Sequence, residues 1–293
     1  MSDLAVLLSP VNVSEGRDQR TLEAIAAAFS GAGARLLDVH SDPDHDRSVF
    51  TLAAAPGALA WALLAGAREA IARIDITGYD GLHPHVGALD VVPLVHLDDS
   101  TRGAACAEAL VTADLLGREL DLPVLLYGAL AGGRTRAELR RRGPAALARR
   151  IEAGELEPDF GPRRIHPRTG AALVAARPPL VAFNLELEPP ATEGDAKRIA
   201  SLIRDGAAEG LPGVRAIGLW LERRGVAQVS CNVEDHRAVP LALLVEAVRR
   251  RLPVAAGELV GLAPACAFDA FPADLPLPGF DPRRHLIEQA LEP

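Results

Sequence analysis

The spacing of apolar and polar residues predicts helices and strands in a regular order along the chain. Between residues 56 and 73, apolar side chains recur at helical spacing, which is typical of a helix with one buried face. Between residues 226 and 234, apolar and polar side chains alternate, which is typical of a strand with one buried face. Read together with the glycine and proline breaks, the pattern predicts strands at 4–8, 35–40, 47–53, 86–95, 123–127, 180–186, 214–222, 226–234 and 258–262, and helices at 19–30, 56–73, 104–119, 134–142, 144–153, 193–207, 241–252 and 284–291.

The order of these elements occurs twice. Residues 4–95 and residues 180–262 each follow the order strand-helix-strand-strand-helix-strand, which is that of a ferredoxin-like unit. We therefore predict an α+β fold of two ferredoxin-like (βαββαβ) subdomains, residues 1–178 and 179–293, with sheets facing across a substrate cleft. The polar face of the second sheet would line this cleft, and plain solvent exposure of that face is the alternative. Its residues are Asn184, Glu186, Gln228, Ser230 and Asn232.

Two further segments have no clear pattern of this kind. We expect residues 154–178 to be irregular, and a segment of that length inside a compact protein is typical of a binding loop or a linker. Arg140, Arg141 and Arg142 follow one another at the end of a predicted helix. We expect these arginines to lie on a solvated face.

Composition and charge narrow the class of protein. The chain has 293 residues, of which 49% are hydrophobic and 24% charged, as in a folded soluble protein. Its net charge of −8 argues against nucleic acid as the main partner. Cys106, Cys231 and Cys266 are widely spaced, which indicates reduced thiols and a cytoplasmic location. We find no signal peptide and no apolar run long enough to cross a membrane, so no membrane partner is expected.

A histidine in a glycine-containing loop is the first candidate for chemistry. His83 follows Gly78 and Gly81 and directly precedes Pro84, which restricts the backbone of His83 to extended angles. Histidine is well suited to exchanging protons near neutral pH. A structural or surface role for this ring is the alternative.

The segment 41–47 carries a dense group of charges. Three carboxylates and His45 within five residues have the composition of a metal site, but Asp-Pro-Asp turns are usually solvent-exposed connections. EF-hand spacing is absent, and we expect no metal. Arg47 opens a predicted strand, where its guanidinium can clamp a substrate carboxylate. The alternative is that the neighbouring Asp46 neutralises it.

Several segments resemble one enzyme family. Residues 81–90, with Gly81, His83, Pro84, Gly87, Ala88 and Asp90, are similar to the G-x-H-P-R-x-G-A-x-D segment of the glutamate formiminotransferases. Residues 12–17 are similar to the family's P-N-F-S-E-G-R segment, and residues 47–51 match part of its D-x-N-R-[ST]-V-x-T segment. Further similar segments lie at 158–162, 182–184, 227–232 and 258–262. The resemblance covers residues 4 to 291.

The resemblance implies an activity and a set of site residues. It implies transfer of a formimino group from N-formimino-L-glutamate to tetrahydrofolate, the co-substrate, in histidine degradation and one-carbon metabolism. His83 is then the catalytic acid-base group, and a homodimer that needs no metal is expected. Arginines 163, 164 and 168 would meet the glutamate tail of the folate. The residues implied to bind substrate or folate are Arg47, Gly161, Pro162, Arg163, Arg164, Ile165, His166, Pro167, Arg168, Thr169, Gly170, Asn184 and Gln228.

The chain departs from the family pattern beside His83. Tyr79, Leu82 and His85 stand where the family has His, Glu and Arg. Three interpretations remain open: an active enzyme that uses other contacts, a formyl or imino transferase with a different amine donor, and a folate-binding or scaffold protein without turnover.

Overall fold

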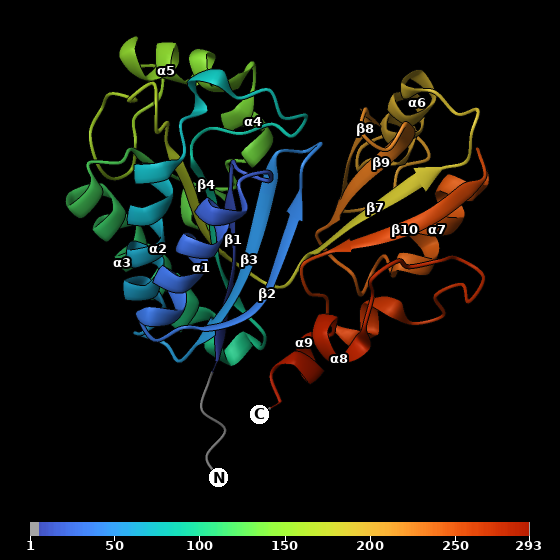
Figure 1. The fold of residues 1–293 in the computed structure, drawn as a ribbon, viewed down its shortest axis with the longest axis horizontal. Helices are drawn as coiled ribbons and strands as arrows, with labels where there is room; N and C mark the ends of the chain where they lie inside the picture. Colours follow the sequence, from blue (N-terminus) through green and yellow to red (C-terminus); the bar gives the residue numbers. More distant parts are fainter. Residues whose placement is uncertain (1–5, 293) are drawn as a thin grey trace. The chain divides into compact units, whose positions relative to one another are not determined.

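The computed structural model describes residues 6–292, and the chain divides into two compact units, Met1–Pro178 and Pro179–Pro293. Each unit has its own sheet, of six strands in the first and four in the second (Figure 1). The predicted mixed α+β class with two sheets is therefore confirmed.

The first unit is a sheet covered by helices on both faces. Its strands are β1 (Leu7–Val13), β2 (Arg35–Asp42), β3 (Arg47–Ala54), β4 (Leu89–His96), β5 (Val124–Leu126) and β6 (Ala172–Arg177), and its helices are α1 (Gln19–Gly31), α2 (Leu59–Arg73), α3 (Arg102–Leu120), α4 (Arg136–Arg140) and α5 (Gly143–Glu152). The strand order is β2-β3-β1-β4-β6-β5, and only the pairs β4–β6 and β5–β6 are parallel. Helices α1, α2 and α3 cover one face, and an apolar cluster beneath α4 and α5 covers the other.

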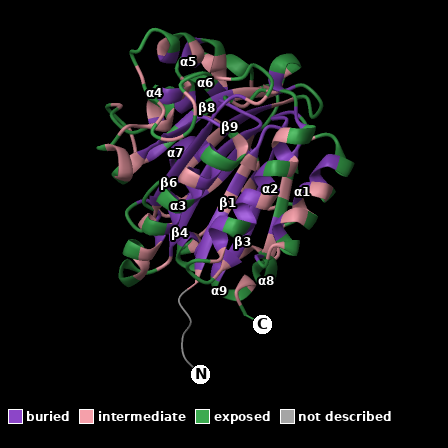
Figure 2. Cartoon of the chain, turned by 90° about the vertical axis from the view of Figure 1, so that its left-hand side faces the viewer, coloured by how far each residue is buried: buried purple, intermediate pink, exposed green. Residues whose placement is uncertain are grey.

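Helix α1 shows how the local sequence sets an element. Asp18 caps its first turn by accepting a hydrogen bond from the backbone N–H of Arg20 at 3.1 Å. Leu22, Ile25 and Phe29 then recur on one side and are buried, as Figure 2 shows for the inner sides of α1 and α2. Phe29 packs on Phe50 of β3 with the ring centroids 5.5 Å apart. The helical spacing of apolar residues thus attaches α1 to the sheet.

In the first unit, the structure corrects the predicted bounds of two strands and adds a third strand that was not predicted. Strand β1 continues to Val13, whereas the sequence predicted a strand at 4–8, of which residues 4 and 5 lie outside the described part. Strand β4 begins at Leu89 and not at residue 86. Strand β6 was not predicted at all, because 154–178 was expected to be irregular throughout. Its residues are apolar on both faces and contribute to both apolar clusters, so no polar alternation indicates a strand.

The second unit is a four-stranded antiparallel sheet. Its strands are β7 (Val181–Leu187), β8 (Val214–Leu221), β9 (Val226–Val233) and β10 (Val254–Val260), and its helices are α6 (Glu193–Ile203), α7 (Leu241–Arg249), α8 (Pro282–His285) and α9 (Ile287–Ala290). The strand order is β10-β7-β9-β8. The predicted terminal helix is two short helices divided at Leu286, and β10 begins four residues earlier than predicted.

The predicted alternation in β9 is confirmed. Ala227, Val229, Cys231 and Val233 enter the apolar core of the second unit, and the polar residues between them lie on the opposite face of the sheet. Helices α6 and α7 pack on the apolar face. Whether the polar face lines a cleft stays a prediction. No helix within residues 6–292 combines the length and the apolar character needed to cross a membrane.

A buried carboxylate from α3 completes the start of α2. The first residues of α2 receive no side-chain cap from their own segment. Instead, the Glu108 carboxylate accepts hydrogen bonds from the backbone N–H of Gly57 at 2.6 Å and of Ala60 at 2.7 Å. Glu108 is 5% exposed, so these bonds are shielded from water. One side chain therefore joins two helices and satisfies donors that an α-helix leaves unpaired.

We predict that Glu108→Ala lowers the free energy of unfolding of the first unit by about 1–3 kcal/mol, because it leaves the buried N–H of Ala60 without an acceptor. Urea unfolding followed by circular dichroism measures the loss. Glu119→Ala, at an exposed position near the end of the same helix, is the matched control and should have a much smaller effect. Equal midpoints for the two variants would contradict the capping role.

Candidate functional site

His83 lies in the loop between α2 and β4, with its ring held by its own backbone. The side chain is partly exposed, and Nδ1 lies 2.8 Å from the carbonyl oxygen of Pro84. Because a carbonyl can only accept, Nδ1 carries the hydrogen in the neutral ring. Nε2 is then the nitrogen with a lone pair that can take a proton. The neighbouring proline thus fixes both the backbone and the tautomer of this histidine.

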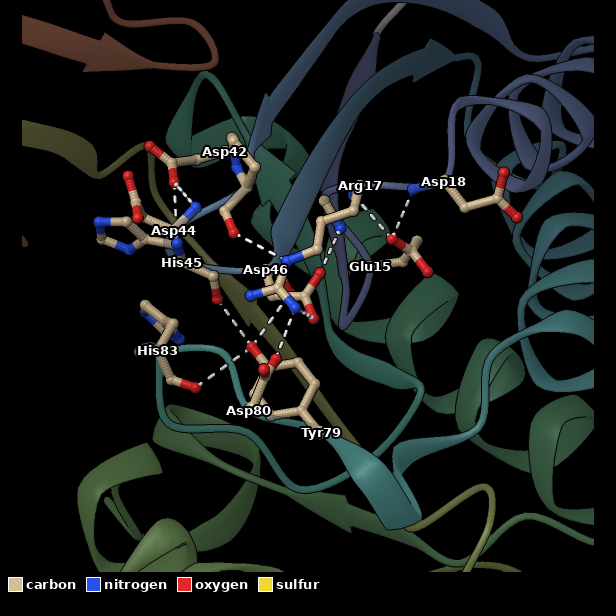
Figure 3. Close-up of polar contacts among 12 residues, drawn as sticks. Glu15, Arg17, Asp18, Asp42, Asp44, His45, Asp46, Tyr79, Asp80 and His83 are labelled. Carbon is tan, nitrogen blue, oxygen red and sulfur yellow. Dashed lines mark hydrogen bonds and ion pairs between the residues drawn. The ribbon is translucent and has the colours of Figure 1, made fainter. Parts of the chain in front are cut away.

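Tyr79 fixes the loop that carries His83. Its hydroxyl lies 2.8 Å from the carbonyl oxygen of His45, 3.0 Å from that of Asp46 and 3.5 Å from that of His83 (Figure 3). Its ring packs on the ring of His85, with centroids 3.9 Å apart. Burial raises the pKa of Tyr79, so the hydroxyl keeps its proton and remains a donor at neutral pH. Tyr79 therefore joins the His83 loop to the turn between β2 and β3.

That turn is buried, which corrects the expectation of a solvent-exposed connection. Asp42 Oδ1 accepts the backbone N–H groups of Asp44 and His45, both at 2.8 Å. The residues from Asp42 to Arg47 that carry charge or an imidazole are each at most 9% exposed. The ring centroid of His45 lies 6.0 Å from that of His83. Within residues 6–292, no cluster of His, Cys, Asp and Glu side chains is arranged to hold a metal ion.

The loop after β1 packs directly on this turn. Asp46 has a positive φ of 48° and accepts the backbone N–H of Gly16 at 2.9 Å. A Cβ on Gly16 would lie 2.3 Å from the carbonyl oxygen of Asp42, so only glycine permits this approach. Arg17 donates to Asp80 at 2.5 Å and to the carbonyl of Pro43 at 3.0 Å (Figure 3). The segment 12–17 therefore forms one wall of the His83 site.

Arg47 is paired by Asp90 and not by Asp46, so the alternative that Asp46 neutralises it is wrong. The Arg47 guanidinium donates to Asp90 Oδ2 at 2.5 Å and to Asn12 Oδ1 at 3.0 Å. Arg140 donates to the same Asp90 oxygen. The other Asp90 oxygen accepts the backbone N–H of Val86 at 2.9 Å. The fully buried Asp90 carboxylate thus accepts hydrogen bonds from two guanidinium groups and from the backbone just after His85.

The expectation of a solvated face for 140–142 is wrong for the first of the three arginines. The Arg140 side chain is 12% exposed and faces Asp90, whereas Arg141 and Arg142 are exposed. The exposed pair line a hollow of about 1040 Å³ between α4 and α5. The short helix α4 begins at a capping box of Thr135 and Glu138 and buries Leu139, which turns Arg140 toward the strand. The sequence carries no sign that distinguishes Arg140 from its two neighbours.

Charge and burial set the protonation of this group. Burial and the positive charges of Arg47 and Arg140 lower the pKa of His83 well below its usual range. Burial alone would raise the pKa of Asp90, but the charges of Arg140 and Arg47 outweigh it and lower that pKa. Burial lowers the pKa of Arg140 to about 10, which leaves it charged at neutral pH. The resting site therefore contains a neutral imidazole, a carboxylate and two guanidinium cations.

The segment implied to bind folate reaches the His83 loop at its far end. Ala88 donates its backbone N–H to Thr169 at 2.9 Å, and Gly87 pairs with Gly170, where a Cβ on Gly87 would lie 2.1 Å from the carbonyl oxygen of Ala171. The rest of the segment lies on the surface of the first unit. Gly161 and Pro162 follow Phe160, which forms an isolated strand-like pair. Arg163 forms an ion pair with Glu157, and Arg164 and Pro167 are exposed. Ile165 packs on an apolar cluster, while Arg168 donates its backbone N–H to His166 Nδ1 and its guanidinium to the carbonyl of Ala72.

Asn184 and Gln228 lie on the polar face of the second sheet. Both donate to Glu258 Oε2, at 2.8 Å and 3.4 Å respectively. Arg224 pairs with Glu186 at 2.5 Å and lies 3.7 Å from Glu258. The two amides predicted to bind substrate are thus brought together on one carboxylate, and their role in binding stays a prediction.

The first unit therefore presents an imidazole with a fixed tautomer beside a buried group of charges, which is a site suited to proton transfer on an anionic substrate. Two family profiles match the chain: "Formiminotransferase domain, N-terminal subdomain" over residues 6–177 and "Formiminotransferase domain" over residues 182–271. The chain belongs to the formiminotransferase family, as the sequence resemblance predicted.

Individual relatives agree with this assignment. The chain is 35% identical to a glutamate formimidoyltransferase of Streptococcus pyogenes over 290 residues, covering 96% of each chain. It is 33% identical to a glutamate formimidoyltransferase of Thermoplasma acidophilum over 296 residues, covering 96% of this chain and 95% of the relative. It is 38% identical to a formimidoyltransferase-cyclodeaminase of Gallus gallus over 271 residues, which cover 86% of this chain and 49% of the relative.

We predict that Asp90→Asn destabilises the first unit by about 3–5 kcal/mol at pH 7, because it leaves two buried guanidinium groups without a counter-charge. The pKa of Asp90 is depressed in the folded state, so its contribution is complete above the ordinary value of 3.8 and is lost as the pH falls through the lower folded value. Urea unfolding at pH 7 and at pH 3 should show the gap between wild type and variant narrowing at the lower pH. Asp99→Asn, at an exposed position, is the control. A gap that is independent of pH would contradict the charge assignment.

Proposed function

We propose that this protein transfers the formimino group of N-formimino-L-glutamate to tetrahydrofolate, its co-substrate, in histidine degradation. The observation that carries the proposal is the geometry of His83, whose Nδ1 is engaged by Pro84 and whose Nε2 is left to accept a proton. The named relatives and the family profiles support the choice of reaction. The proposal makes the protein a transferase of one-carbon metabolism that acts on two small anionic substrates.

The reaction requires one group to move a proton twice. A nitrogen of tetrahydrofolate attacks the formimino carbon and gives its proton to His83 Nε2, which produces a tetrahedral carbon. The bond from that carbon to the glutamate nitrogen then breaks, and the protonated His83 gives its proton to the departing nitrogen. Its lowered pKa makes the imidazolium a strong acid, which favours this second transfer.

We extend the proposal to the architecture around this site. The strand orders β2-β3-β1-β4 and β10-β7-β9-β8 support two ferredoxin-like subdomains, divided near residue 178. Asn184 and Gln228, which share Glu258 on the second sheet, are the substrate-binding residues that the second unit supplies in this proposal. The segment 161–170 meets the folate, with its arginines at the glutamate tail. A cytoplasmic homodimer completes the proposal.

The second candidate function is folate binding without turnover. It is favoured by the pair formed by Tyr79 and His85, which stand where the family has His and Arg. Burial lowers the pKa of His85, so this side chain is neutral and cannot replace the charge of an arginine. Leu82 likewise brings no carboxylate to the loop. A turnover assay separates this candidate from the transferase.

We predict that His83→Asn lowers the turnover number by about 100-fold or more, because the base acts mainly in the transition state. Affinity for tetrahydrofolate should stay within a few-fold. The measurement follows the absorbance change as tetrahydrofolate is substituted, with formiminoglutamate as donor. His85→Asn is the comparison, because the His85 ring packs on Tyr79 and no proton transfer is assigned to it. Full activity in His83→Asn, or no turnover together with tight folate binding in the wild type, would overturn the catalytic assignment.

The pH dependence follows from the depressed pKa of His83. A base must be neutral, so the ratio kcat/KM should be flat from pH 8 down to the ordinary histidine value of 6.5 and should fall only below it. Steady-state kinetics between pH 5 and pH 8 measure the profile. An acid limb with its midpoint at or above 6.5 would show that another group is the base.

A further inference from the structure

The charges buried around Asp90 do not balance. Arg47 and Arg140 both donate to Asp90 Oδ2, while Asp90 Oδ1 is used by the backbone of Val86. Arg47 has one further acceptor, the neutral amide oxygen of Asn12. Two guanidinium cations thus share one carboxylate, which leaves one excess positive charge among side chains that are at most 12% exposed. Buried charge of this kind is costly unless an anion pairs with it.

One of the two arginines also has an unused donor. Arg140 Nε is buried and has no hydrogen-bond partner within residues 6–292. Buried guanidinium donors are ordinarily satisfied, and an unsatisfied one costs free energy. Arg47, in contrast, uses Nε to bond to Asn12. The unused donor therefore lies within the same pair of guanidinium groups that carries the excess charge, and both features call for an anion that is able to accept a hydrogen bond.

We propose that Arg140, together with Arg47, holds the α-carboxylate of the amino-acid donor. The inference rests on the proposed function and deepens it, because it names the residue that anchors the donor. In an N-formimino amino acid, the α-carboxylate is attached to the same carbon as the nitrogen that bears the formimino group. An anchor for this carboxylate must therefore lie close to the group that protonates that nitrogen.

The position of the two guanidinium groups fits the donor better than the folate. Both groups bond to Asp90, whose other oxygen accepts the backbone N–H of Val86, three residues after His83, and their positive charge lowers the pKa of His83. The carboxylates of a folate are separated from the reactive pterin by the whole aminobenzoyl group, so they cannot lie beside His83 while the pterin reacts there. Planar guanidinium groups also match a carboxylate in geometry. Arg140 is thus assigned as a substrate-binding residue supplied by α4.

The decisive variant is Arg140→Gln, and its matched control is Arg141→Gln. Arg141 is adjacent in sequence, exposed, and makes no hydrogen bond or ion pair in the described part of the chain. Loss of a charge-assisted contact predicts that Arg140→Gln raises the KM of formiminoglutamate by about 10-fold to 100-fold. The turnover number and the KM of tetrahydrofolate should change by no more than a few-fold. Arg141→Gln should match the wild type in all three.

Two results would overturn the inference. One is an unchanged donor KM in folded Arg140→Gln. The other is a rise in both KM values and a fall in the turnover number, together with a lower unfolding temperature. That combination is expected of an ion group with a purely structural role. If Arg140→Gln does not fold, Arg140→Lys replaces it. That variant keeps the charge but loses the guanidinium fork, so the donor KM alone should rise several-fold, and a donor KM equal to that of the wild type would overturn the inference.

A binding measurement separates this inference from the proposed function. If the wild type does not turn over formiminoglutamate, the proposed function fails. Calorimetric titration with L-glutamate then still tests Arg140. Saturable binding in the wild type and in Arg141→Gln that weakens at least 10-fold in Arg140→Gln supports the inference. Equal binding in all three proteins, or no binding by the wild type, overturns it.

Discussion

The arrangement of the first unit depends on one buried carboxylate. Asp90 stands at the start of β4, where it receives Arg47 from β3, Arg140 from α4 and the backbone N–H of Val86. Through Arg47 it is also joined to Asn12 of β1. Segments separated by up to 128 residues, from Asn12 to Arg140, therefore meet at one side chain. Because this meeting point is shielded from water, its charges act on one another with little screening, and they set the protonation of the histidine that follows α2.

The His83 loop is held by packing around it more than by its own sequence. The Tyr79 hydroxyl bonds to backbone carbonyls of the β2–β3 turn, and Asp46 of that turn accepts the backbone N–H of Gly16. Tyr79 and His85 replace two polar residues of the family pattern, and in this chain their rings pack against each other at a tilt of 48°. Two of the replaced positions thus contact each other and, through the Tyr79 hydroxyl, the backbone carbonyl of His83. This explains how the loop can keep a defined geometry although three of its usual polar residues are absent.

The same arrangement relates binding to chemistry. With two guanidinium groups nearby, the imidazole of His83 is neutral at rest, and an incoming carboxylate would offset part of the positive charge that lowers its pKa. Binding of an anionic donor would therefore make His83 a better base at the moment when a proton must be removed. The rigid loop supplies the position of the ring, and the buried charges supply its protonation state.

The sequence by itself determined the α+β class, the two sheets, most helices and the position of His83 in a loop before a strand. These features follow from local rules, namely the periodicity of apolar residues and the backbone restriction imposed by Pro84. The tertiary structure alone decided that β6 is a strand, since a segment buried on both faces has no alternation to read. It also decided that Asp90, and not the adjacent Asp46, pairs with Arg47. Finally, it separated Arg140 from Arg141 and Arg142, because one turn of α4 points the first toward a distant carboxylate and leaves the others in solvent. Tertiary packing determines which residues far apart in the sequence become partners, and no local sequence pattern indicates which they are.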